Sequence, residues 1–186
     1  MRRAMLQSLD HKGPMYIRIA KGGDPIVTTD DIPFKIGKAL VMRHGLDALI
    51  ITTGITLNNG LEAAGRLEQE GIKACVLHVP TIKPFDREAI LRHAKEVPVI
   101  VTIEEHSILG GLGGAVAEIV SEANFPTPKK FKRLGIPDVF AEQYGSQAGL
   151  MKGFGITTDN IVVTIKNLSK TKAPSGKLIE PQLIEE

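Results

Sequence analysis

The sequence has a single cysteine, no long apolar run and no excess of charge of one sign, and each absence excludes a class of protein. Cys75 has no partner for an internal disulfide, which is typical of a reducing compartment, so we expect a cytoplasmic protein. No apolar run approaches the roughly 20 residues that cross a bilayer, so we expect no membrane association. The 23 basic residues nearly balance the 21 acidic ones, which gives no indication of a nucleic-acid partner.

The composition is that of an ordinary globular domain. Apolar residues make up 42% of the 186 positions, enough to fill one core, and charged residues make up 24%. This length suits one domain with appendages. We expect the segment 169–186, which is rich in Lys, Pro, Ser and Glu, to be a flexible tail.

Apolar segments rich in β-branched residues alternate along the chain with segments of helical periodicity. We expect strands at residues 15–20, 38–45, 47–54, 73–79 and 97–105. We expect helices at residues 1–12, 56–71, 85–97, 112–124, 138–145, 146–155 and 157–168. Asp86 is placed to cap the helix that follows it, and Thr157 or Thr158 to cap the last one.

This alternation predicts parallel β-α-β crossovers and a three-layer α/β/α domain over about residues 34–168. The segment 38–45 precedes the strand at 47–53 by a short turn. From this nearness alone we expect the two to pair as a hairpin. Many enzymes and many non-enzymes share such an architecture, so the pattern alone does not predict a function.

The stretch "TIEEHSILGGLGG" (102–114) joins a strand to a glycine-rich helix start. Free amides at a helix N-terminus favour an anion, so dinucleotide binding has to be considered. The spacing lacks the third glycine of G-x-G-x-x-G, and Glu104 and Glu105 place negative charge beside any phosphate. We therefore interpret the glycines as allowing close packing of helix and sheet, and the carboxylates as caps of backbone amides.

The loops that leave the carboxyl ends of the central strands are the place where ligands bind in open parallel sheets. The candidate pocket at this switch point comprises Thr53, Gly54, Glu105, His106, Gly110 and Gly111.

Catalytic, cofactor-binding and metal-binding residues are not evident. Glu105 and His106 are adjacent on a strand and point to opposite faces, so they do not share a target. The histidines lack the spacing of a metal site, and we expect His78 and His93 to be structural. Cys75 lies in the middle of a strand and is interpreted as a buried apolar residue.

A run of four basic residues follows the loop "FPTP". We interpret this run as a solvated loop rather than an anion site. It comprises Lys129, Lys130, Lys132 and Arg133.

The order and spacing of several segments resemble the C-terminal part of transketolase-type thiamine diphosphate enzymes, over about residues 13–168. The most specific pieces are "TIKPFD", "TIEEHSILGGLGG" and "GFGITTDNI". The resemblance implies a five-stranded mixed sheet with four parallel strands and one antiparallel edge strand, here 38–43. It also implies that residues 1–28 are a remnant of the middle (pyrimidine-binding) domain, ahead of the C-terminal domain at 34–168.

The same resemblance carries implications for the chemistry. Thiamine diphosphate and a divalent metal bind in the intact enzyme to segments that this chain lacks, so we expect the chain to bind neither and to be inactive alone. Its expected partner is the N-terminal portion or subunit of the same enzyme, and the intact protein is expected to be a homodimer. The family motif R-x-x-R-G corresponds to Arg18 and Lys21, which implies contact with a substrate phosphate in the intact enzyme.

Four functions remain open at this stage. The first is the C-terminal part of a transketolase, which transfers a ketol group between sugar phosphates. The alternatives within the family are the C-terminal part of a 1-deoxyxylulose-5-phosphate synthase and that of a 2-oxoacid dehydrogenase decarboxylase β-subunit acting as a docking module. The fourth, expected without the resemblance, is a free-standing nucleotide-binding protein.

Overall fold

The structure is a computed structural model that describes residues 2–19, 26, 28–30, 32–142 and 144–170. Its centre is a five-stranded sheet of order β1-β3-β2-β4-β5. The strands are β1 (Leu40–Arg43), β2 (Ala48–Thr52), β3 (Ala74–His78), β4 (Val99–Ser107) and β5 (Lys130–Ile136). Four strands are parallel, whereas β1 runs antiparallel to β3 at one edge. The predicted fold class and its antiparallel edge strand are therefore confirmed.

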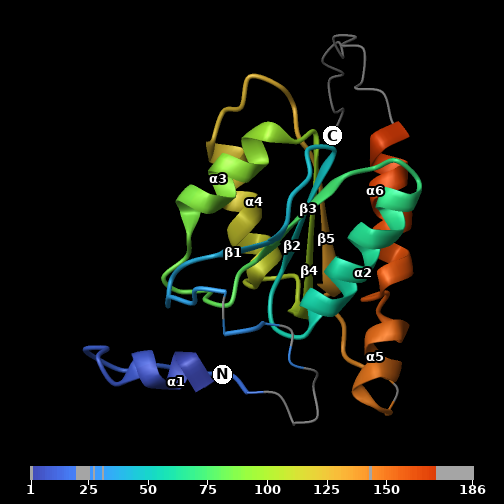
Figure 1. The fold of residues 1–186 in the computed structure, drawn as a ribbon. Coiled ribbons are helices and arrows are strands. Elements are labelled where there is room, and N and C mark those ends of the chain that lie inside the picture. Colours follow the sequence, from blue (N-terminus) through green and yellow to red (C-terminus); the bar gives the residue numbers. More distant parts are fainter. Residues whose placement is uncertain (1, 20–25, 27, 31, 143, 171–186) are drawn as a thin grey trace, which may run out of the picture.

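Helices cover both faces of the sheet and make the outer two layers (Figure 1). On one face lie α2 (Thr56–Gln69) and α6 (Thr158–Lys170), and on the other lie α3 (Arg87–Glu96) and α4 (Leu112–Glu122). Two short helices, α1 (Arg2–Ser8) and α5 (Gln147–Gly153), bury none of their residues. No helix among the described residues is long and apolar enough to span a membrane.

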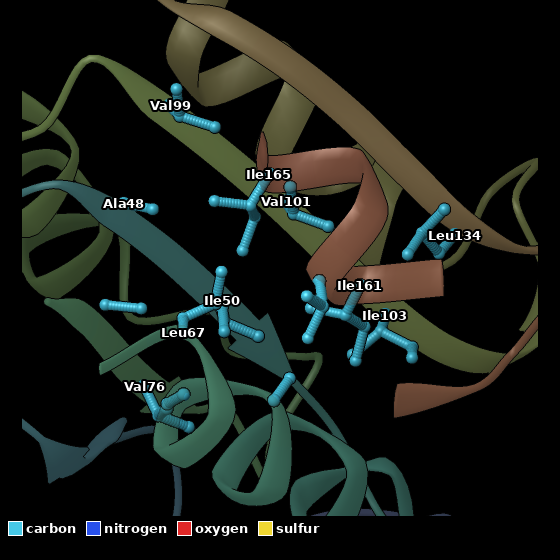
Figure 2. Close-up of a cluster of buried hydrophobic side chains, with 14 of the residues drawn as sticks. Ala48, Ile50, Leu67, Val76, Val99, Val101, Ile103, Leu134, Ile161 and Ile165 are labelled. Atoms are coloured by element: carbon cyan, nitrogen blue, oxygen red, sulfur yellow. The ribbon is translucent and has the colours of Figure 1, made fainter. Parts of the chain in front are cut away.

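The central strand β2 shows how the sequence builds both layers. All five of its residues are buried, as a continuous apolar run predicts for a strand covered on both faces. Because successive side chains point to opposite faces, Ala48 and Ile50 pack with α2 and α6, whereas Leu49 and Ile51 pack with α3 and α4. Figure 2 shows the first of these two clusters, in which Ile161 and Ile165 of α6 lie over the sheet beside Ile50 and Val101.

The predicted helix caps are confirmed. The carboxylate of Asp86 accepts a hydrogen bond from the amide of Ala89 (3.3 Å) and also one from the amide of Ala39 (3.0 Å). Burial alone would raise the pKa of Asp86, but these amides and the ammonium group of Lys38 hold that pKa below its usual value. Thr157 caps α6, because its hydroxyl accepts from the amide of Asn160.

Two expected elements are wrong. Residues 15–19 form no strand, because no neighbouring strand within the described part pairs with them, and Ala20 lies outside that part. Residues 138–142, 144 and 145 form no helix, although the following segment does form α5 as expected. Val139, Phe140 and Tyr144 stay exposed, and a short helix in water is unstable without a packed apolar face.

The expected hairpin between 38–45 and 47–53 is also wrong. Both sides of β2 are taken by the parallel strands β3 and β4, so β1 can join the sheet only at the free edge of β3. There Leu40 pairs with His78 and Val41 with Leu77. The edge position that the family resemblance implies is the observed one.

The basic run is not a solvated loop. Lys130, Lys132 and Arg133 belong to β5, which sequence analysis did not assign as a strand. The ammonium group of Lys129 donates to the carbonyls of Lys95 (2.7 Å) and Val97 (2.9 Å) at the end of α3. That of Lys130 donates to the carbonyl of Leu168 in α6 (2.7 Å). These cations therefore stabilise helix C-termini, where carbonyls lack intrahelical partners. The segment 171–186 of the expected tail lies outside the described residues.

Candidate functional site

The candidate site lies where β2 and β4 end side by side. From β2 the chain moves to β3 on one side, and it later returns to place β4 on the other side. This reversal is the switch point at which open α/β sheets bind ligands. The loops that follow β2 and β4 therefore decide what this edge of the sheet can do.

Threonines after β2 fasten the strand ends to one another. The hydroxyl of Thr53 donates to the carbonyl of Val79 after β3 (2.8 Å). The hydroxyl of Thr56 lies 2.9 Å from the carbonyl of Ile103 in β4 and 2.8 Å from that of Thr53. Gly54 adopts a positive φ of 55°, which suits the tight turn into α2. Thr53 and Gly54 thus have structural roles here that sequence reasoning did not foresee.

Glu104 occupies the helix N-terminus that an anion would need. Its side chain is 1% exposed, and its two oxygens accept from the amides of Leu112 and Gly113, both at 2.7 Å. The prediction that a carboxylate caps these amides is confirmed for Glu104. Because a protein carboxylate already satisfies both donors and the positive end of the helix dipole, the loop does not fit a phosphate group.

The glycines of this loop allow the close approach that the cap requires. A Cβ on Gly111 would lie 2.0 Å from a carboxylate oxygen of Glu104, and one on Gly113 would lie 2.8 Å from Thr102 Oγ1 and Arg133 Cγ. The interpretation of tight helix–sheet packing is therefore confirmed at these two positions. The hydroxyl of Thr102 has no hydrogen-bond partner within the described part of the chain.

Glu105 points away from Glu104 and binds side chains instead of amides. One of its oxygens lies 3.0 Å from the guanidinium of Arg18, and the other accepts from Gln147 Nε2 at 2.7 Å. The side chain of Glu105 is 13% exposed and that of Arg18 is 50% exposed. Glu105 therefore joins the N-terminal segment and α5 at the end of β4. Sequence reasoning missed Gln147 because it lies 42 positions from Glu105 in the chain, and no local pattern links the two.

The remaining candidate residues are dispersed. His106 is exposed and points away from Glu105, as the alternation of a strand predicts. Gly110 lines an open groove of about 660 Å³ between α4 and β5, which is not at the β2–β4 junction. Lys21 lies outside the described residues. Of the six residues of the candidate pocket, only Gly110 lines the groove between α4 and β5.

Three titratable groups in or beside β3 have ordinary packing partners. His78, at the end of β3, lies with its Nδ1 3.0 Å from the hydroxyl of Thr52, and burial lowers its pKa to about 4. Burial raises the pKa of the Cys75 thiol to about 11, so this side chain is a neutral thiol and a poor nucleophile. His93 lies 3.9 Å from the sulfur of Cys75, and burial lowers its pKa as well. Each histidine thus has a side-chain neighbour in the sheet, Thr52 for His78 and Cys75 for His93.

Two features of the described residues bear on the binding of metals and phosphates. They include no group of three or more His, Cys, Asp or Glu side chains that could hold a metal ion. The helix amides after β4 are satisfied by Glu104. What the arrangement offers is a rigid sheet edge with one exposed cation, Arg18, held by a carboxylate.

Comparisons with known proteins agree with one another. Residues 37–161 match the family model "Transketolase, C-terminal domain". A 6-deoxy-6-sulfo-D-fructose transketolase subunit of Clostridium sp. is 40% identical over 172 residues, which are 92% of this chain and 52% of that protein. A 1-deoxy-D-xylulose-5-phosphate synthase of Heliobacterium modesticaldum is 34% identical over 164 residues, 87% of this chain and 25% of that protein.

A solved structure is similar over most of the chain. It is a split-gene transketolase, described as an inactive β4 tetramer, and it superposes with a TM-score of 0.82 at 37% identity. The similarity covers 90% of this chain and 54% of the other. The chain therefore spans about half the length of this protein and of the Clostridium relative.

Proposed function

Because this chain belongs to the transketolase C-terminal domain family, we propose that it works as the C-terminal part of a two-part transketolase-type enzyme. In the assembled enzyme it supports ketol transfer between sugar phosphates. Thiamine diphosphate and its divalent metal bind to the N-terminal portion, supplied by a partner subunit, and the assembled enzyme is a homodimer of these parts. The chain alone is inactive.

The observation that carries this proposal is the match over residues 37–161 together with the similarity to a split-gene transketolase. The geometry supports it as well. The chain offers no place for a phosphate at the loop after β4, because Glu104 occupies the helix amides there. It does offer a scaffold that holds an exposed arginine at the carboxyl edge of the sheet.

Arg18 is the residue through which the chain contacts substrate in this proposal. Its guanidinium is held on one side by Glu105, yet half of the side chain stays exposed, so donors remain for a phosphate oxygen. Lys21 is the proposed second phosphate contact. Neither residue takes part in bond making; they position the sugar phosphate by charge.

The test is reconstitution. The chain is mixed with the N-terminal portion of its enzyme, thiamine diphosphate and Mg²⁺, and ketol transfer from a ketose phosphate to an aldose phosphate is measured. We expect activity only when both parts are present, and Arg18→Gln should raise KM for the phosphorylated substrate at least tenfold. A reconstituted complex that forms but shows no transfer with any sugar phosphate would refute the proposal.

A second activity has specific support, since a 1-deoxy-D-xylulose-5-phosphate synthase is 34% identical to this chain. That enzyme class uses pyruvate as donor and releases carbon dioxide. The same reconstituted complex distinguishes the two, because carbon dioxide release from pyruvate with glyceraldehyde 3-phosphate would assign the synthase reaction. Transfer from a ketose phosphate without carbon dioxide would assign the transketolase reaction.

A further inference from the structure

The carboxylate of Glu105 is shared between two partners that lie far apart in the sequence. Its Oε1 lies 3.0 Å from Nη2 of Arg18, and its Oε2 accepts a hydrogen bond from Nε2 of Gln147 at 2.7 Å. An arginine and a carboxylate often meet in a bidentate contact, in which two parallel N–H groups reach both oxygens. Because Gln147 takes the second oxygen, Glu105 holds Arg18 through the first one.

This division of the carboxylate decides how much of Arg18 stays available. A guanidinium offers several N–H donors in a planar fork, and a contact with one oxygen leaves donors free on the side that faces solvent. A bidentate contact would use a further donor and would turn the fork toward β4. The side chain of Arg18 is 50% exposed, whereas that of Glu105 is 13% exposed, so the carboxylate is the fixed member of the pair.

We propose that Gln147 is a positioning residue that keeps Arg18 open to the phosphate group of the substrate. Gln147 does not contact the substrate. It acts through Glu105, whose second oxygen it holds away from the guanidinium. This inference rests on the proposed function, in which Arg18 contacts the phosphate. It adds α5 as the element that sets the strength of this contact.

The anchoring of α5 makes Gln147 a firmly placed donor. Gln147 is the first residue of α5, and the preceding Ser146 caps the helix by accepting a hydrogen bond from the amide of Gly149 at 3.1 Å. Toward the other end, Met151 and Phe154 pack against the buried cluster under α2 and α6. The helix is therefore fixed at its start and along its apolar side, and the donor cannot readily follow a carboxylate that turns.

The chemistry of the amide suits this task. A lysine at position 147 would also bind the second oxygen of Glu105, but it would bring another cation that attracts phosphate by itself. A carboxylate at this position would repel Glu105. The glutamine amide donates a hydrogen bond without carrying charge. Among Arg18, Glu105 and Gln147, the group that offers positive charge to a substrate is thus Arg18.

The test compares two acceptors that differ only by a phosphate, D-glyceraldehyde 3-phosphate and D-glyceraldehyde. The reconstituted complex is assayed at a saturating concentration of a ketose phosphate donor. Gln147→Met keeps the length of the side chain but removes the donor. We expect it to raise KM for D-glyceraldehyde 3-phosphate about three- to tenfold and to leave kcat within about twofold of the parent value. KM for D-glyceraldehyde should also stay within about twofold, because this acceptor carries no phosphate.

Two further variants separate positioning from a general disturbance of the protein. Gln69→Met makes the same change at an exposed glutamine in the last turn of α2, and it should leave both KM values unchanged. In an Arg18→Gln background, Gln147→Met should have no further effect on KM, since the residue through which it acts is gone. Thermal unfolding first shows that every variant is folded.

Three results would overturn the role of Gln147 while the parent complex still transfers ketol groups. These are an unchanged KM for D-glyceraldehyde 3-phosphate in Gln147→Met, an equal rise in KM for both acceptors, and an effect that persists without Arg18. Each of them leaves the proposed function standing. A parent complex that forms but shows no transfer would instead refute the proposed function, and this inference with it.

Discussion

Glu104 and Glu105 are neighbours in sequence but act on opposite faces of β4. Glu104 is buried and binds two amides of α4, whereas Glu105 reaches the surface and binds Arg18 and Gln147. The difference follows from the pleat of the strand, which sends successive side chains in opposite directions. Two identical side chains therefore fix a helix on one side and two distant segments on the other.

Gly111 is predicted to be essential for the cap that Glu104 makes. In Gly111→Ala the new Cβ would lie 2.0 Å from the Glu104 carboxylate, so the carboxylate must leave its two amide donors. We expect a loss of about 2–3 kcal/mol in the free energy of unfolding, measured by urea denaturation. Gly114→Ala is the control, because its Cβ meets nothing closer than 3.8 Å and alanine favours a helix. Equal stability of both variants would contradict the role of Gly111.

His78 is predicted to make stability depend on pH. Burial lowers its pKa in the folded state to about 4, against 6.5 when exposed. The unfolded chain therefore binds the proton more readily, and the stabilising effect is complete above pH 6.5 and is lost as pH falls from 6.5 towards 4. The shift corresponds to about 3 kcal/mol over this window.

Urea denaturation at several pH values measures this contribution. His78→Gln keeps a polar group near Thr52 but cannot titrate, so the slope of unfolding free energy against pH between 6.5 and 4 should become shallower. His11→Gln, at an exposed histidine, should leave the slope unchanged. An equally steep slope in His78→Gln would show that another group is responsible.

At the level of elements, local sequence patterns predict most of the strands and the helices that cover the sheet, but they do not predict which strands pair with each other. Continuous apolar runs predicted β2, β3 and β4, because a strand covered on both faces has no polar side. The pairing of β1 was mispredicted from nearness in sequence, since the order of the sheet depends on crossovers that local patterns do not contain. The strand β5 was missed because three of its seven residues are basic.

The candidate site was predictable to a similar extent. The capping role of a carboxylate after β4 and the packing role of the glycines follow from "EEHSILGGLGG" alone. The contacts of Glu105 do not, because they join residues 42 and 87 positions away, and such distances depend on the folded arrangement. A helix was wrongly predicted at 138–145 because the spacing of its apolar residues is helical. In the structure Val139, Phe140 and Tyr144 are exposed, so no packing stabilises a helix there.

Lys129 is predicted to stabilise the end of α3. Its ammonium group donates to two carbonyls, and burial lowers its pKa, opposed by the charge of Glu96. Lys129→Met keeps the apolar stem but leaves both carbonyls without this donor, which should lower the free energy of unfolding by about 1–2 kcal/mol. Lys132→Met, at an exposed lysine of β5, should change it by less than about 0.5 kcal/mol. If urea denaturation showed the same loss of stability for Lys129→Met and Lys132→Met, the loss of a positive charge, and not the loss of the bonds to the α3 carbonyls, would be responsible.

At the scale of the whole molecule, the two helical layers and the sheet form one packed unit. The side chains of both clusters come from residues between 39 and 168. The N-terminal segment instead meets this unit through the polar pair Arg18–Glu105, while the Gln7 amide bonds to Phe34 and Ile36, just ahead of the unit. Stability therefore comes mainly from the packed unit.

The position of the first strand has a consequence for how such proteins can be encoded. Within the described residues, every strand pairing of the sheet joins positions between Leu40 and Ile136, and the bonds that tie the preceding segment to Thr81 and Asp86 begin at Gly37. A polypeptide break ahead of Gly37 therefore severs neither the sheet nor these bonds. A gene boundary placed there would leave the sheet and its helices on one polypeptide.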